Sequence, residues 1–83
     1  MASQKQLKLN ISRVNGSVFA GEVISVTVPG SEGEMTLLAD HTPIVSALRA
    51  GVVTWRLANG ESESLKIESG TLEVSHNNVT ILL

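Results

Sequence analysis

The chain of 83 residues lacks cysteine and tyrosine, and Phe19 and Trp55 are its only aromatic residues. The absence of cysteine excludes disulfides, thiolate chemistry and zinc–thiolate sites. A chain this short buries only about 60 to 65% of its extended surface, so its core is thin. Because aromatic residues and cysteine are scarce or absent, the 42% of residues that are hydrophobic are almost entirely Val, Leu, Ile and Ala. We expect a single domain, residues 1–83, that gains stability from a partner as well as from its own core.

Lysine and arginine are absent from residues 14 to 48, and the net charge of the whole chain is −2. Nucleic-acid binding needs a clustered basic surface, so this charge distribution argues against it. An acid-only stretch, by contrast, suits a basic partner. The acids of that stretch are Glu22, Glu32, Glu34 and Asp40.

No apolar run approaches the roughly 20 residues that cross a bilayer, and the polar N-terminus does not resemble a targeting signal. The sequence therefore predicts a soluble chain that stays in the compartment where it is made.

Apolar residues alternate with polar ones along most of the chain, which is the period of a half-buried strand. The pattern predicts strands near residues 7–11, 18–28, 35–38, 52–57, 65–67, 72–74 and 79–83, and a strand or helical turn at 44–48. Gly21 is interpreted as a bulge or break inside the 18–28 run. Asn59-Gly60 predicts a type I′ hairpin turn, and His76-Asn77-Asn78 predicts another turn. The fold class is therefore all-β, an antiparallel β-sandwich of about eight to ten short strands.

Catalytic and metal sites find little support in the sequence. Asp40-His41 is the only acid–histidine neighbour pair, and Ser31 in Gly30-Ser31-Glu32-Gly33 lacks the spacing of a nucleophile elbow, so we interpret Ser31 as a turn residue. His41, His76, Asp40 and Glu34 lie in different predicted loops at no ligand spacing. The glycines do not follow phosphate-loop spacing. We predict no catalytic residue, no metal and no cofactor, and we place Trp55 in the core.

Several motifs along the chain together resemble the epsilon subunit of the bacterial rotary ATP synthase, whose chloroplast equivalent and mitochondrial delta equivalent are similar. They begin with Val23, Val28-Pro29-Gly30 and Glu32-Gly33-Glu34, and continue with His41-Thr42-Pro43, Leu48 and Gly51. They end with Gly70-Thr71-Leu72-Glu73-Val74 and Asn78-Val79-Thr80-Ile81-Leu82. The resemblance implies the family's N-terminal β-sandwich, which sits at the foot of the central stalk.

That resemblance implies a non-catalytic rotor subunit that links the gamma subunit to the c-ring and couples proton flow to ATP synthesis. It implies that Glu32, Gly33 and Glu34 face the basic loops of the c-ring. It also implies that His41, Thr42, Pro43 and Ser46 face gamma. The expected location is peripheral, on the cytoplasmic face of the bacterial inner membrane.

One difference from the family qualifies these expectations. Members of the family continue into two C-terminal helices that inhibit ATP hydrolysis and in several cases bind ATP, and the 83 residues contain neither helix. We therefore expect coupling without helix-mediated inhibition, and no small-molecule ligand, from this form. The alternative function is a free-standing β-sandwich module that binds a peptide or glycan through its loops, which exposed loop aromatics would favour.

Overall fold

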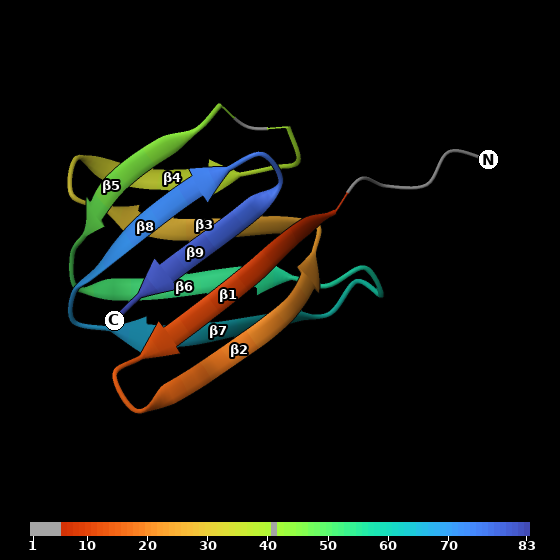
Figure 1. Cartoon of the computed structure of the whole chain (residues 1–83). Helices are drawn as coiled ribbons and strands as arrows, with labels where there is room; N and C mark the ends of the chain where they lie inside the picture. The colour runs from red at the N-terminus through yellow and green to blue at the C-terminus, as the bar shows by residue number, and fades with distance from the viewer. Residues whose placement is uncertain (1–5, 41) are drawn as a thin grey trace.

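The computed structural model describes residues 6–40 and 42–83, which form nine strands (Figure 1). The strands are β1 (Leu7–Arg13), β2 (Gly16–Val23), β3 (Ser25–Gly30), β4 (Gly33–Leu37), β5 (Ile44–Leu48), β6 (Gly51–Arg56), β7 (Ser62–Ile67), β8 (Gly70–Ser75) and β9 (Asn78–Leu82). Residues 44–48, where the sequence allowed either a strand or a helical turn, form a strand. Within the described ranges, no helix has the length and apolar character needed to cross a membrane.

The strands form one continuous sheet that folds over itself into two layers. One layer has the order β2-β1-β9-β8-β5, and the other has the order β4-β3-β6-β7 (Figure 1). The layers are joined where β5 meets β3, at the single pair Gly30↔Leu48. Two backbone hydrogen bonds flank that pair, from Ser31 N–H to the Ala47 carbonyl (3.0 Å) and from Arg49 N–H to the Pro29 carbonyl (2.9 Å).

The predicted all-β sandwich is confirmed, with one difference in strand direction. β1 and β9 run parallel, from Lys8↔Asn78 to Ser12↔Leu82, whereas the other strand pairs of the described residues are antiparallel. The alternation of apolar and polar residues is the same for both directions, so the sequence pattern did not distinguish them. This parallel pair makes the sheet mixed.

The core lies between the two layers and is aliphatic apart from Trp55. Alternate residues of each strand point into it, as the buried positions Leu7, Leu9 and Ile11 of β1 show. The other members of the core are Val23, Val26, Val28, Leu37, Leu48, Val53, Trp55, Ile67, Leu72, Val74, Val79 and Ile81. No polar or charged residue is buried among residues 6–40 and 42–83.

The two aromatic residues meet at one open side of the sandwich. Phe19 comes from the edge strand β2 and Trp55 from β6 in the other layer, and their ring centroids lie 5.0 Å apart at an interplanar angle of 45°. Tilted rings at this separation attract each other beyond the effect of buried area. The prediction that Trp55 belongs to the core is confirmed, since its side chain is only 4% exposed.

The long β-branched run at residues 18–28 divides at Ile24, between β2 and β3. The interpretation of Gly21 as a bulge or break is wrong, because Gly21 pairs in register with Leu9. The irregularity lies at Val18, which has no partner between the pairs Ile11↔Phe19 and Ser12↔Ser17. Gly21 instead leaves room for a ring: a Cβ there would lie 3.3 Å from Cζ of Phe19.

The predicted type I′ turn at Asn59-Gly60 is also wrong. Type I′ needs two consecutive positive φ angles, but Asn59 is not among the described non-glycine residues with positive φ, whereas Gly60 has a φ of 92°. The loop is longer: Gly60 N–H donates to the Leu57 carbonyl (2.9 Å), and Leu57 N–H donates to the Glu61 carbonyl (2.7 Å). The Asn59 side chain accepts from Glu61 N–H (2.9 Å), which stabilises the wider turn.

Leu72→Ala tests the core. Leu72 is fully buried, so its truncation should lower the free energy of unfolding by about 2 to 5 kcal/mol. Urea denaturation followed by Trp55 fluorescence measures the change. Val45→Ala is the matched control, since Val45 is 71% exposed and should change stability by no more than about 0.5 kcal/mol. Equal losses for the two variants would contradict the placement of the core.

Gly30→Ala tests the close approach at the β3–β4 turn. A Cβ at Gly30 would lie 2.7 Å from the Gly33 carbonyl oxygen and 2.9 Å from Cε of Met35. Because a backbone atom cannot move aside cheaply, we expect a loss of about 1 to 3 kcal/mol. Gly21→Ala is the control, since there the nearest atom belongs to a side-chain ring that has room to shift. Thermal unfolding measures the stability of both variants. A larger loss of stability for Gly21→Ala than for Gly30→Ala would contradict the assignment.

Candidate interaction surface

The β3–β4 hairpin presents the acidic residues Glu32 and Glu34. Ser31 and Glu32 form its two-residue turn, between the paired residues Gly30 and Gly33. Gly33 has a φ of 136°, which L side chains rarely adopt. The local sequence therefore fixes a tight turn with both carboxylates beside it, and Ser31 occupies the turn position that the sequence predicted.

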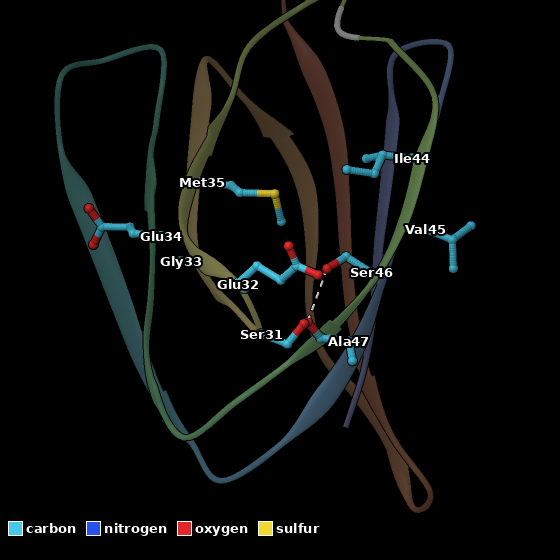
Figure 2. Close-up of a pocket in the computed structure, with 10 residues that line it drawn as sticks. Ser31, Glu32, Gly33, Glu34, Met35, Ile44, Val45, Ser46 and Ala47 are labelled. Atoms are coloured by element: carbon cyan, nitrogen blue, oxygen red, sulfur yellow. Dashed lines mark hydrogen bonds between the residues drawn. The ribbon is translucent and has the colours of Figure 1, made fainter.

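A groove of about 450 Å³ lies beside this turn, between β4 and β5 (Figure 2). Met35 and Ile44, one from each strand, are partly buried hydrophobic residues packed against the core. The other lining residues are Gly30, Ser31, Glu32, Gly33, Glu34, Val45, Ser46 and Ala47. The groove thus has an apolar floor and an acidic rim, and all its charged lining residues among those described are acids.

The two glutamates take opposite directions. Figure 2 shows the Glu32 side chain extending across the groove toward Ser46, whereas the Glu34 side chain points away from it on the outer side of β4. Both residues are exposed. The turn therefore presents one carboxylate to whatever enters the groove and the other to a surface beyond it.

The β5 wall is held by hydrogen bonds to the Ala47 carbonyl. Ser31 N–H donates to it (3.0 Å), and so does the Ser46 hydroxyl (3.1 Å). Ser46 is half-buried within the groove, while Val45 points outward from it (Figure 2). Ser46, predicted to face gamma, thus lies beside the residues predicted to face the c-ring.

The remaining residues predicted to face gamma lie elsewhere. Thr42 and Pro43 are exposed in the β4–β5 connection, beyond the other end of β4, and His41 lies outside the described residues. Pro43 lines a second hollow of about 350 Å³ with Asp40, His76 and Asn77. The three described positions predicted to face gamma therefore lie in two places, Ser46 beside the groove and Thr42 and Pro43 beyond the other end of β4.

Asn77 organises that second place, and sequence reasoning had treated it only as a turn residue. Its side-chain oxygen accepts from Asp40 N–H (2.6 Å), and its side-chain nitrogen donates to Oδ1 of Asp40 (3.4 Å). Asp40 and His76 both have positive φ, at 65° and 56°. The β8–β9 turn therefore stabilises the β4–β5 connection. The Asn-rich turn was the only local sign of this contact, and it does not reveal that Asn77 binds Asp40, which lies 37 residues away in the chain.

The acid-only stretch does not form one surface. Glu22 lies opposite Lys8 in the β1–β2 pair, which offsets its charge. Asp40 follows the far end of β4, about 16 Å of strand away from the Glu32 turn. Only Glu32 and Glu34 remain together as an uncompensated acidic site. Among the described residues, no three metal-ligating side chains converge.

Residues 6–83 match the family described as ATP synthase, Delta/Epsilon chain, beta-sandwich domain. The chain is similar to proteins named ATP synthase epsilon chain from three organisms. Identity is 41% over 76 residues with that of Wolinella succinogenes, 40% over 78 residues with that of Sulfurimonas denitrificans and 43% over 77 residues with that of Nitratiruptor sp.. These alignments cover 92 to 94% of the chain but only 58 to 60% of the relatives, so the chain spans about three fifths of their length.

Two solved structures share the fold. The first is a chain of the Euglena gracilis mitochondrial ATP synthase, described as OSCP/F1/c-ring in rotational state 1, with a TM-score of 0.88 and 26% identity. It covers 93% of this chain and 49% of its own. The second, from the central stalk/c-ring of the Tetrahymena thermophila mitochondrial ATP synthase, has a TM-score of 0.78, 11% identity and coverages of 98% and 65%. At 11% identity it supports the fold alone.

The family match over residues 6–83 and three relatives at 40 to 43% identity confirm the resemblance first indicated by the sequence motifs. The chain belongs to the family of ATP synthase delta/epsilon subunits, of which it contains the β-sandwich domain.

Proposed function

We propose that this chain is a non-catalytic subunit of the central stalk of a proton-translocating ATP synthase. In this role it links the gamma subunit to the c-ring, turns with them as part of the rotor and couples proton flow to ATP synthesis. The observation that carries the proposal is the family match across residues 6–83. The relatives' shared name, ATP synthase epsilon chain, and the c-ring in the description of the Euglena assembly support it.

The fold suits a subunit that transmits force. Its two layers enclose an apolar core, and hydrogen-bonded pairing links the strands from β2 to β7. Such an interior is close-packed and has low compressibility, so a force applied to one face is transmitted to the other. Because the core is thin, docking should raise the stability of the folded state: a partner that binds only the folded state stabilises it by mass action.

Glu32, Gly33 and Glu34 are proposed to face the basic loops of the c-ring. The uncompensated charge of the β3–β4 turn supports this role, because an acidic rim steers a basic partner and fixes its register. Ser46, Thr42, Pro43 and His41 are proposed to face gamma. Since Ser46 and Glu32 line the same groove, the two contacts are proposed to meet there.

The proposed location is peripheral, at the cytoplasmic face of the bacterial inner membrane, where other subunits anchor the complex. Its partners are proposed to be proteins alone, with no cofactor. Because the described residues form strands and turns, we propose that this segment contributes coupling and not helix-mediated inhibition. A glycan-binding role lacks its aromatic platform, since Phe19 and Trp55 pack against each other.

Mixing the chain with a purified gamma subunit tests the proposal. We expect a one-to-one complex by gel filtration and calorimetry, together with a higher unfolding temperature for the bound chain. Circular dichroism of the free chain provides the control for folding. A folded chain that forms no complex at micromolar concentrations would contradict the stalk role and redirect the search to peptide and glycan ligands.

Charge reversal at the turn tests the c-ring contact. Glu34→Lys and Glu32→Lys should each weaken binding of the chain–gamma complex to purified c-ring about tenfold at low salt, because a cation then meets the ring's basic loops. The loss should shrink as ionic strength rises. Both residues are exposed, so the fold should stay intact.

Glu61→Lys is the control, because it makes the same charge change in the β6–β7 loop, at the other end of the sandwich (Figure 1). Unchanged ring binding by both turn variants, or an equal loss for Glu61→Lys, would contradict the assignment of the β3–β4 turn to the ring.

A further inference from the structure

The outer edge of β4 has backbone hydrogen-bonding groups that no strand of the described residues satisfies. Pro29 C=O accepts from Arg49 N–H (2.9 Å), so the backbone groups of Pro29 face β5. Backbone groups of successive strand residues point to alternate edges, so those of Val28 and Gly30 face β4, where they meet Met35 and Gly33.

It follows that Glu34 and Thr36 direct their N–H and C=O groups away from β3. In the described residues β4 pairs with β3 alone, so these four groups lie at an unpaired edge. That edge borders the groove of about 450 Å³ between β4 and β5. An unpaired row of donors and acceptors beside a groove is the arrangement used for β-strand addition.

Two other outer edges, those of β2 and β7, carry features that discourage strand addition. On β2 the unpaired residue Val18 interrupts the ladder. On β7 charged residues occupy or flank the strand, namely Glu61, Glu63, Lys66 and Glu68. The sequence of β4, Gly-Glu-Met-Thr-Leu, contains neither proline nor lysine, and its pairing with β3 is regular. β4 thus combines an uninterrupted ladder with a single charged residue, Glu34, whereas a bulge interrupts β2 and four charged residues occupy or flank β7.

We infer that the β4 edge receives an extended segment of the gamma subunit, which adds as a strand and places a lysine or arginine near Glu32. This inference rests on the proposed function for the identity of the partner. One observation and one part of the proposed function select the occupant. Among described residues the groove has only acids as charged lining, and these lie at the Glu32 end. Its opposite wall holds Ser46, which is proposed to face gamma, so the edge is continuous with that interface.

The apolar floor of the groove determines which types of side chain the added segment can place there. Side chains of an added strand point alternately to its two faces, and one set would meet Met35 and Ile44. Small or aliphatic residues at alternate positions fit there. The segment is therefore an alternating apolar sequence that ends in a basic residue.

Amide exchange of the isotope-labelled 83-residue chain, measured by NMR with and without purified gamma, tests this inference. Strand addition should slow exchange at the amides of Glu34 and Thr36 by at least about tenfold, since each would gain a backbone acceptor. The amides of Gly33 and Met35, which already face β3, should change less. Docking through side chains would not give this alternation.

Thr36→Pro, with Thr36→Ala as its matched control, provides a second measurement. Both remove the hydroxyl that bonds Thr27 (3.2 Å), but only proline removes an N–H, and it does so at an edge where proline is tolerated. We expect Thr36→Pro to weaken gamma binding about tenfold relative to Thr36→Ala. If Thr36→Pro does not fold, the exchange pattern of the unmodified chain decides.

The outcomes separate this inference from the proposed function. A complex with gamma in which Glu34 and Thr36 exchange as in the free chain overturns strand addition and leaves the stalk role intact. Slowed exchange at these amides with the c-ring, but not with gamma, overturns the choice of partner. If no complex forms with gamma, the proposed function fails and this inference fails with it.

Discussion

The joint between the two layers is the constraint on which the rest of the structure depends. β3 is shared: its first half pairs with β6, while its last residue, Gly30, pairs with Leu48 of β5. Pro29 is accommodated in this central strand because its backbone faces the place where β5 ends and β6 begins. Its carbonyl accepts from Arg49 N–H (2.9 Å), and the β3–β6 ladder ends at Thr27, before the residue that has no N–H to donate. One strand thereby serves both layers.

A sheet folded over in this way has two open sides, and the chain has little apolar bulk with which to close them. The pair Phe19–Trp55 closes the side between β2 and β7. On the side between β4 and β5 the largest groups are Met35 and Ile44, which are only partly buried. The groove is therefore a consequence of composition: with two aromatics and a thin core, one side is filled and the other is left for a partner.

The sequence predicted the elements of the fold better than the relations between them. Alternation along Leu7–Ile11 or Leu72–Val74 is a local signal, and these residues are buried as predicted. The parallel β1–β9 pair, the Gly30–Leu48 joint and the Asn77–Asp40 contact each link segments far apart in the chain, and no local pattern carries that information. The acidic turn at residues 32–34 was visible in the sequence. The opposite directions of Glu32 and Glu34 followed only once a two-residue turn had been placed between Gly30 and Gly33.

The character of the outer surface explains why a backbone edge matters for a subunit of this kind. Across the layer that begins with β5, one row of outward positions reads Val45, Glu73, Thr80 and Asn10. Apart from Val45, which is apolar and 71% exposed, these side chains are polar or charged, and dispersed contacts of this kind each contribute little to binding. A rotor contact, however, must hold its orientation under torque. Directional backbone hydrogen bonds in a fixed register resist sliding in a way that dispersed side-chain contacts do not. In this sandwich the Glu34 and Thr36 edge has that geometry, and an acidic turn at its end sets the direction of the segment that it receives.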